Sequence, residues 1–404
     1  MTNSSLKILS TITAYPPAIG GAQLHTHQML SILAQTHRVR VITQWTENRT
    51  DWLLGTTLKA PYHLSNYELD GVEVNPITLG LKERLFLIPL VMGFYLTKSI
   101  SIDKISEAFV PKIHELSQGF DLIQNVRMGR ENLSYASLKV AQNLDIPFIF
   151  VPLHHPRWVG WLYREYIQLY RQADALIALT HVEKNILIKL GVKEEKIFVT
   201  GIGPLLSEKQ EASRFRNQYS LGSDPIVLFL GQKYPYKGIE AFIKTAERVW
   251  KKCPETRFVA IGPRTPFSET LFAEVKDCRI LELGSVSLQE KTDALAACNI
   301  LCVPSMQESF GGVYTEAWMM KKPVIGGNIP AIRDVIDEGE NGFLVEQNSS
   351  QIADKIIELL NNPSLCIQLG EAGYQKVLEH YTWEKLAEKM QSVYTQVLHR
   401  SSGN

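Results

Sequence analysis

Two carboxylates and a glycine pair in the second half of the chain combine residue types that suit a polar, phosphorylated ligand. Glu308 and Glu316 stand eight positions apart, and Gly311 and Gly312 lie between them. Carboxylates accept hydrogen bonds from hydroxyl groups, and glycine lets backbone N–H groups approach an anion closely. Together they suit a ligand that carries both hydroxyls and phosphate, as a sugar nucleotide does.

The predicted strand before this pattern and the predicted helix after it determine where its side chains lie. The short apolar run 299–305 predicts a buried strand, and residues 317–322 predict a helix that ends before Pro323. Glu308 is therefore expected in the loop at the carboxyl end of a strand. The glycine pair is expected at the helix start, where the helix dipole favours an anion, and Glu316 about one turn into the helix.

This arrangement resembles the Glu-x7-Glu signature of the retaining glycosyltransferases of family 4. The resemblance implies that Glu316 grips the ribose diol of a nucleotide and that Glu308 lies beside the donor sugar. The alternative is an ordinary strand, loop and helix with two solvated carboxylates. The glycine pair and the preceding strand favour the resemblance over this alternative.

A second loop, Gly231 to Gly238, resembles the Gly-Arg…Lys-Gly loop of the same family. Lys237 matches the family's lysine, a cation that would stabilise the diphosphate as it leaves. The family's arginine position holds Gln232, which lacks the cationic fork of arginine. We expect Lys233, the next residue, to supply the missing charge; the alternative is a weaker grip on the donor.

Two segments of the first half extend the resemblance. Gly20 and Gly21 resemble the family's N-terminal glycine loop, which lies near the donor phosphates and the acceptor; the alternative is a tight turn between strand and helix. His154 and His155 follow a predicted strand that ends at Pro152. The resemblance implies that a histidine here contacts the donor sugar, and His155 fits that position better than His154.

Strands and helices alternate along the whole chain, which indicates parallel sheets covered on both faces. The alternation begins at Leu6 to Thr13, pauses in the polar stretch 207–224 and restarts at Ile226 to Leu230. Two such halves predict an α/β protein of two Rossmann-like, doubly wound parallel-sheet domains. The resemblance implies the GT-B architecture, in which two such domains face each other across a cleft.

The predicted domain bounds follow from the pause in the alternation. Residues 1–205 form an N-terminal domain on the acceptor side, and residues 206–382 form a C-terminal domain that binds the nucleotide sugar. The resemblance implies that a C-terminal helix, about residues 383–404, packs back on the first domain.

Composition is that of an ordinary globular protein and argues against several classes. The 404 residues include 42 Lys plus Arg and 42 Asp plus Glu, so no net charge attracts nucleic acid or acidic membrane. The five cysteines are scattered, without metal-like spacing, which indicates a reducing, cytoplasmic compartment. The N-terminus lacks signal-peptide form, and no apolar run reaches the roughly 20 residues that span a bilayer.

One apolar segment, Leu85 to Leu96, stands outside the common pattern. Pro89 and Gly93 interrupt it, and Lys82 is among the cations that flank it. We predict a buried helix that packs on the first domain. The alternative is an interfacial contact with the inner face of a membrane, or an apolar acceptor site.

The resulting hypothesis is a retaining glycosyltransferase that moves a sugar from a UDP- or GDP-sugar to an acceptor hydroxyl on a glycan, a lipid-linked molecule or a small molecule. Because the sequence contains no Asp-x-Asp triplet, we expect transfer without a metal, and no cofactor besides the donor substrate. Two alternatives stay open: a sugar-nucleotide epimerase of the same fold, and a non-catalytic nucleotide-sugar-binding protein, which Gln232 motivates.

Overall fold

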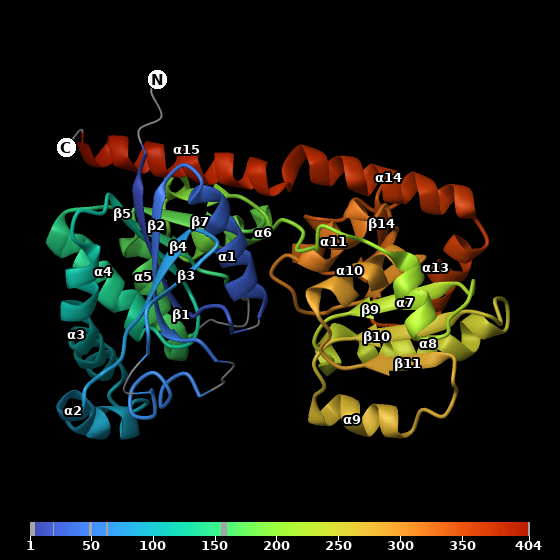
Figure 1. The fold of residues 1–404 in the computed structure, drawn as a ribbon, viewed down its shortest axis with the longest axis horizontal. Coiled ribbons are helices and arrows are strands. Elements are labelled where there is room, and N and C mark those ends of the chain that lie inside the picture. The colour runs from blue at the N-terminus through green and yellow to red at the C-terminus, as the bar shows by residue number, and fades with distance from the viewer. Residues whose placement is uncertain (1–4, 19, 48–50, 62–63, 155–159, 403–404) are drawn as a thin grey trace. The chain divides into compact units, whose positions relative to one another are not determined.

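The computed structural model describes residues 5–18, 20–47, 51–61, 64–154 and 160–402 (Figure 1). The chain divides into two units. The first comprises Met1–Thr200 together with Trp383–Asn404, and the second comprises Gly201–Thr382. The boundary drawn from the sequence, after residue 205, lies a few residues beyond this one.

The first unit is built on an eight-stranded sheet of order β3-β4-β2-β1-β5-β6-β7-β8, in which only β3 and β4 pair antiparallel. Its strands are β1 (Lys7–Ala14), β2 (Arg38–Trp45), β3 (Tyr67–Leu69), β4 (Val72–Pro76), β5 (Leu122–Val126), β6 (Phe148–Val151), β7 (Ala175–Ala178) and β8 (Ile197–Val199). Its α-helices are α1 (Gly21–Leu33), α2 (Leu81–Met92), α3 (Lys98–Ser117), α4 (Asn132–Leu144), α5 (Arg164–Gln172), α6 (His181–Lys189) and α15 (Trp383–Ser402).

Helices cover both faces of this sheet, and each face has its own apolar core. On one face, Leu9 and Ile42 of the strands pack with residues of α2 to α6, among them Phe109. On the other face, Ile8 and Ile12 pack with α1 and α15. Successive strand residues point to opposite faces, which explains why neighbours such as Ile8 and Leu9 belong to different cores.

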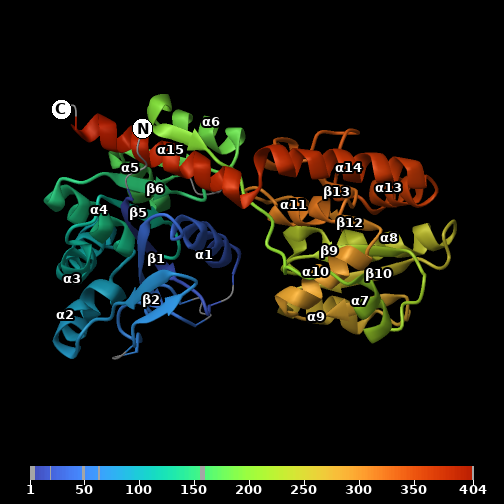
Figure 2. The ribbon, with the colours of Figure 1, turned by 45° about the horizontal axis from the view of Figure 1, so that its top comes forward.

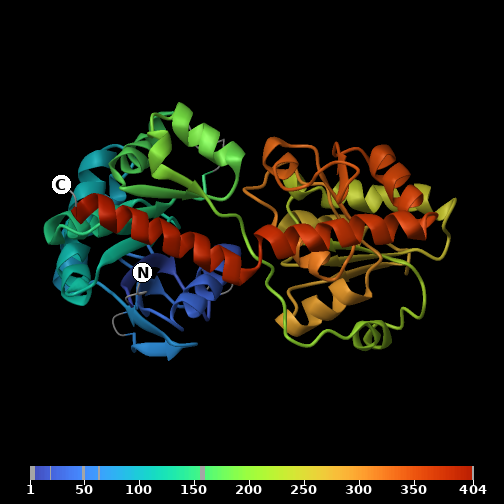
Figure 3. The ribbon, with the colours of Figure 1, turned by 90° about the horizontal axis from the view of Figure 1, so that it is seen from above.

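The C-terminal helix α15 runs along the first unit's sheet (Figures 1 and 3). Met390, Val393, Tyr394 and Val397 are all buried and recur at helical spacing, so one stripe of the helix faces the sheet. The Tyr394 hydroxyl donates a 2.7 Å hydrogen bond to the side chain of Gln124 in β5. The helix thus belongs to the first unit although the chain reaches it through the second.

The second unit is built on a six-stranded, fully parallel sheet of order β11-β10-β9-β12-β13-β14 (Figure 2). Its strands are β9 (Ile226–Leu230), β10 (Arg257–Ile261), β11 (Ile280–Leu283), β12 (Ile300–Val303), β13 (Val324–Gly327) and β14 (Gly342–Val345). Its α-helices are α7 (Ala212–Gln218), α8 (Ile239–Trp250), α9 (Pro266–Ala273), α10 (Leu288–Ala297), α11 (Gly312–Met319), α12 (Pro330–Arg333), α13 (Ser349–Leu360) and α14 (Pro363–His380). The predicted class, two α/β units with doubly wound sheets, is confirmed.

The apolar segment 85–96 is buried on one face only, which corrects the prediction of a buried helix. Leu87, Val91 and Phe94 are buried in the core, whereas Phe86 is 69% exposed and Met92 77% exposed. The segment therefore presents apolar side chains both to the core and to solvent. Within the described ranges, no helix is both long and apolar enough to cross a bilayer.

Candidate functional site

The strand order of the second unit reverses between β9 and β12, and the predicted site residues gather there. β10 and β11 follow on one side of β9, and β13 and β14 follow on the other side of β12. In open parallel sheets, ligands bind beyond the carboxyl ends of the strands at such a reversal. Two loops leave the sheet at this point: one runs from Gly231 to Gly238, the other from Pro304 to Gly311.

Lys237 and Glu308, one from each loop, meet in an ion pair between Nζ and Oε1. Their side chains are 17% and 14% exposed, so both are reachable from solvent while held in place. Lys237 ends a 3-10 turn, η3 (Pro235–Lys237), and its ammonium also lies 5.7 Å from the centre of the Tyr236 ring. A cation and a carboxylate are thus brought together from positions 71 residues apart.

Gln347 holds the two loops against each other. Its side-chain amide donates hydrogen bonds of 3.1 Å to the carbonyls of Tyr236 and Pro304, one in each loop. The backbone N–H of Met306 adds a 2.7 Å bond to the Tyr236 carbonyl. The two loops that contain Lys237 and Glu308 are therefore held to each other by hydrogen bonds.

Glu316 lies in α11, as predicted, and is buried against Lys291 of α10. Lys291 Nζ donates a 2.7 Å bond to Glu316 Oε1, and the side chains are 18% and 5% exposed. Burial raises the pKa of Glu316 above its ordinary value, and Lys291 opposes that rise. The partner lysine thus favours the ionised carboxylate, the form that accepts the stronger hydrogen bonds.

Gly311 and Gly231, one in each loop, have positive φ angles, which favour glycine. Gly311 caps α11 with φ of 86°, and a side chain there would meet the Tyr314 ring at 2.4 Å. Gly312 is the first residue of that helix. Gly231 has φ of 148°, and nothing lies within 4 Å of where its Cβ would be. The backbone at Gly231 is therefore open to a ligand, beside the exposed side chain of Gln232.

The position of Lys233 corrects its predicted role. Its ammonium is fully buried, donates to the carbonyls of Gly262 and Leu283, and is paired with Glu282. Burial lowers its pKa, which Glu282 opposes. A diphosphate cannot reach this ammonium, so Lys233 does not replace the missing arginine at Gln232. It ties the β9 loop to the ends of β10 and β11 instead.

The glycines and histidines predicted as site residues in the first unit lie in different environments. Gly20 caps α1, and a Cβ there would meet the Gln23 side chain at 2.4 Å, while Gly21 has open space around its Cβ position. His154 is buried, and its backbone N–H donates a 2.6 Å bond to Glu183. His155 lies outside the described residues.

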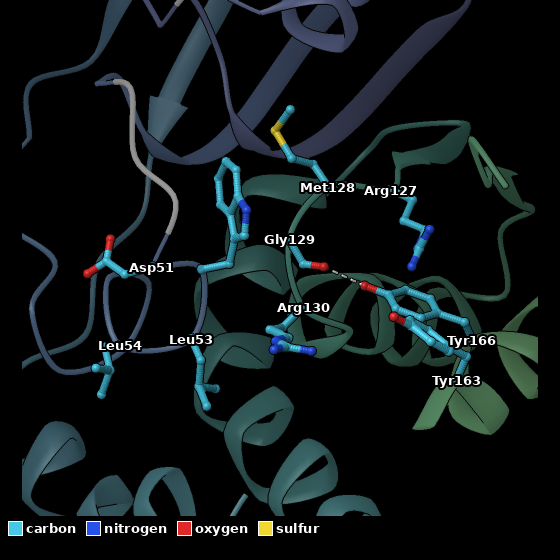
Figure 4. A pocket seen from close by; sticks show the side chains of 10 residues that line it. Asp51, Leu53, Leu54, Arg127, Met128, Gly129, Arg130, Tyr163 and Tyr166 are labelled. Carbon is cyan, nitrogen blue, oxygen red and sulfur yellow. Dashed lines mark hydrogen bonds between the residues drawn. The ribbon is translucent and has the colours of Figure 1, made fainter. Parts of the chain in front are cut away.

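The first unit has a pocket that the sequence did not reveal, at its own strand reversal between β1 and β5. The pocket has a volume of about 600 Å³ and is lined by residues 51–54 and 127–130 with Tyr163 and Tyr166 (Figure 4). The guanidinium carbon of Arg127 lies 3.8 Å from the centre of the Tyr166 ring. The Tyr166 hydroxyl donates a 2.7 Å bond to the Gly129 carbonyl.

Other residues were also missed for a physical reason. Lys291 and Gln347 stand in no motif, because their partners are 25 residues or more away and meet them only through the fold. Among the described residues, no group of three or more His, Cys, Asp or Glu gathers as metal ligands would. The described residues at the β9/β12 reversal offer cations, carboxylates and backbone amides.

Sequence comparison identifies the segment that carries these loops. Residues 211–376 match the profile of the family described as glycosyl transferases group 1. We call residues 211–376 the group 1 segment after this match. The group 1 segment contains Lys237, Glu308 and Glu316 together with the two partners, Lys291 and Gln347, that hold them.

Curated relatives match over a comparable length. An uncharacterized glycosyltransferase of Methanocaldococcus jannaschii is 30% identical over 182 residues, which are 44% of this chain and 50% of that protein. A GDP-mannose-dependent alpha-(1-6)-phosphatidylinositol monomannoside mannosyltransferase of Mycobacterium tuberculosis is 26% identical over 190 residues, 44% of this chain and 49% of that protein. The chain thus spans about half the length of these relatives.

Solved structures resemble the whole chain. Anabaena HepE, in complex with UDP-glucose, is 16% identical with a TM-score of 0.72, over 99% of this chain and 100% of that one. Sucrose-phosphate synthase from Thermosynechococcus elongatus is 21% identical with a TM-score of 0.73, over 98% of this chain and 100% of that one. The predicted GT-B fold is confirmed by these likenesses.

Proposed function

We propose that the protein is a glycosyltransferase that moves a sugar from a nucleoside diphosphate sugar to an acceptor hydroxyl. The observation that carries the proposal is the Lys237–Glu308 pair at the β9/β12 reversal, inside the group 1 segment. Glu308 stands three residues before Gly311, the N-cap of the eight-residue helix α11, whose first turn has no side-chain cap hydrogen bond. The N–H groups of such a first turn suit an anion.

The roles follow from the chemistry of each group. Lys237 and the amides at Gly311 and Gly312 hold the diphosphate and stabilise its charge as it leaves. When the phosphate takes up Lys237, the Glu308 carboxylate is released toward the hydroxyls of the donor sugar. Glu316, whose pairing with Lys291 favours the carboxylate form, accepts hydrogen bonds from the ribose diol. These groups would supply the charge stabilisation without a metal, and no separate cofactor is required.

Retention of the anomeric configuration, a UDP- or GDP-sugar as donor and a cytoplasmic location complete the proposal. A structural relative bound to UDP-glucose and a sequence relative named as GDP-mannose-dependent support this choice of donors. Proton NMR of the product tests retention, since the coupling constant at the new anomeric carbon distinguishes the two configurations. An inverted product would overturn this part of the proposal alone.

The test of the transfer itself uses labelled UDP- and GDP-sugars with a panel of alkyl glycosides. Label should move to an acceptor, and Lys237→Ala should reduce turnover by about 100-fold or more. Lys244→Ala is a matched control, because Lys244 also pairs with a glutamate but is 64% exposed on α8. Transfer that is equally fast in both variants would contradict the assigned site.

Incubation of the donor alone separates the remaining alternatives. An epimerised donor would show that the protein is an epimerase of the same fold. Nucleotide binding without transfer or epimerisation, for any donor and acceptor, would favour a non-catalytic protein, which the exposed Gln232 at the arginine position motivates.

A further inference from the structure

Phe310 is a buried aromatic residue inside the loop that carries Glu308. It lies two residues after Glu308 and directly before Gly311, the N-cap of α11, and its side chain is 1% exposed. Its ring meets the ring of Tyr381 edge to face, with ring centres 5.2 Å apart and an interplanar angle of 83°. A phenyl ring has no hydrogen-bonding group to offer a nucleotide, so its place between two site residues indicates a role in positioning them.

Gly201 packs against both of these rings. A Cβ at this residue would lie 2.6 Å from Cε1 of Tyr381 and 3.4 Å from Cε2 of Phe310. The backbone of Gly201 therefore lies directly on the Tyr381 ring and close to the Phe310 ring, with no room for a side chain. We call Gly201, Phe310 and Tyr381 the ring cluster; all three residues belong to the second unit.

The ring cluster lies where the chain enters and leaves the second unit. Gly201 is the first residue of that unit, and Tyr381 is the last but one. Tyr381 is also fixed by α14, because its backbone N–H donates a 2.8 Å hydrogen bond to the carbonyl of Val377. Through Phe310, the loop that carries Glu308 is therefore packed against both ends of the second unit.

The chain that enters the second unit continues along the surroundings of Glu316. Burial raises the pKa of Glu316, and Lys291 and a hydrogen bond with the backbone of Leu205 oppose that rise. Two residues further on, the backbone N–H of Ser207 donates a 2.9 Å hydrogen bond to Oγ1 of Thr292, the residue after Lys291 in α10. The same short segment thus contacts the ring cluster first and the Glu316 site next.

From these contacts we propose that Phe310 and Tyr381 are positioning residues, whose packed rings hold the loop that carries Glu308 where it meets the donor. Residues 201–207 link this packing to Glu316. The inference rests on the proposed function, because it concerns the donor site of that reaction. The two rings touch no reacting atom and act through Glu308. A loop that is free to shift would still bind nucleotide through the other ligands, but Glu308 would be out of place beside the donor sugar.

Transfer kinetics and calorimetric titration of UDP and GDP, each with wild type, Tyr381→Ala and Tyr381→Phe, test the positioning role. Tyr381→Ala should lower kcat about tenfold or more, because small misplacements of reacting groups slow a reaction steeply, while nucleotide affinity changes less than about threefold. Tyr381→Phe keeps the ring that packs on Phe310 and should restore the wild-type kcat. A melting curve checks that the variants stay folded.

Gly201→Ala approaches the same packing from the other side, and Gly339→Ala is its matched control. Both glycines belong to the second unit and have positive φ, 88° for Gly201 and 76° for Gly339. A Cβ at Gly201 would push into the Tyr381 ring, whereas nothing lies within 4 Å of the Cβ position of Gly339. Gly201→Ala should therefore lower kcat as Tyr381→Ala does, and Gly339→Ala should leave kcat unchanged.

Hydrogen exchange of the backbone amides of residues 307–312 follows the loop without donor or acceptor. Exchange should be faster in Tyr381→Ala than in wild type and unchanged in Gly339→Ala. Equal kcat in all variants, unchanged exchange in Tyr381→Ala, or a loss of nucleotide affinity as large as the loss of kcat would overturn the positioning role. Faster exchange in Tyr381→Ala, with no transfer by wild type to any acceptor, would refute the proposed function and leave the rings as the packing that holds the loop.

Discussion

The two strand reversals of this protein have opposite chemical characters. In the second unit, the reversal between β9 and β12 carries paired charges on short loops, Lys237 with Glu308. In the first unit, the reversal between β1 and β5 carries a pocket with three aromatic rings and segments drawn from three parts of the chain. The first kind of site suits one constant group, a diphosphate. The second offers ring faces and charged groups, which we expect to suit an acceptor.

The largest change in stability is expected for Lys233→Ala. Comparison with Lys237→Ala distinguishes a structural lysine from a ligand-binding lysine in the same loop. Lys233→Ala leaves the carbonyls of Gly262 and Leu283 without their donor, although Glu282 keeps Arg264 as partner. Each buried acceptor left unpaired costs about 1–3 kcal/mol, so the free energy of unfolding should fall by about 2–5 kcal/mol. Lys237→Ala, whose pair is partly exposed, should leave stability nearly unchanged. Urea denaturation of both variants measures the difference. A stable Lys233→Ala protein with weakened donor binding would restore Lys233 as a diphosphate ligand.

A second prediction concerns pH and the first unit. Glu183 accepts hydrogen bonds from the N–H groups of Leu179 and His154, and burial raises its pKa to about 7. Because the folded protein then binds a proton that the unfolded chain has released, stability should fall as pH rises from about 4.5 to 7, by up to about 3 kcal/mol.

Glu183→Gln, which does not titrate, should flatten this dependence in denaturation curves recorded at several pH values. Glu194→Gln is the matched control, because Glu194 is 69% exposed and pairs with Lys184. An unchanged slope in Glu183→Gln would show that another group causes the dependence.

The third prediction, smaller in size, concerns nucleotide binding by Glu316. Glu316→Gln keeps the size of the side chain but removes the charge that strengthens hydrogen bonds from a diol, so nucleotide binding should weaken by roughly 1–3 kcal/mol. Calorimetric titration measures the change, with Glu371→Gln as control, since Glu371 pairs with Lys321 on the surface. Equal affinities in the two variants would remove Glu316 from the nucleotide site.

The smallest effect is expected for a substitution in the pocket of the first unit. Trp52 stacks on Trp45 with ring centres 5.2 Å apart and lines the pocket. Trp52→Ala should raise the acceptor KM by an amount equivalent to about 0.5–1.5 kcal/mol, through loss of one stacking face, and leave donor affinity unchanged. Steady-state kinetics with both substrates varied measures this. A change in the KM for the donor, with the acceptor KM unchanged, would show that the pocket does not bind the acceptor.

The comparison of the two reversals also explains what the sequence could predict. The strands were predictable because short apolar runs with glycine at their ends mark buried parallel strands; Ile226 to Leu230 was placed to the residue. The two loops at the β9/β12 reversal were predictable because the residues within each loop are close in sequence. Lys233 was misjudged because nothing local shows that Glu282 and two carbonyls enclose its ammonium.

Neither the pocket nor the exposed side of α2 could be predicted from local sequence patterns, for related reasons. The pocket walls come from residues 51–54 and 127–130 with Tyr163 and Tyr166, which lie far apart in the sequence and meet only in the fold. The segment 85–96 is apolar on both faces, so periodicity does not distinguish Phe86, which is exposed, from Phe94, which is buried. Only the packing of α2 against the core separates them.

Nucleotide binding at the β9/β12 reversal is the central claim, and calorimetric titration of UDP and GDP into wild type, Lys237→Ala and Lys244→Ala tests it most directly. Wild type and Lys244→Ala should bind one of the two nucleotides with the same affinity, and Lys237→Ala should bind it at least about tenfold more weakly with an unchanged melting temperature. Equal affinity in all three proteins, or no binding of either nucleotide by wild type, would contradict the account.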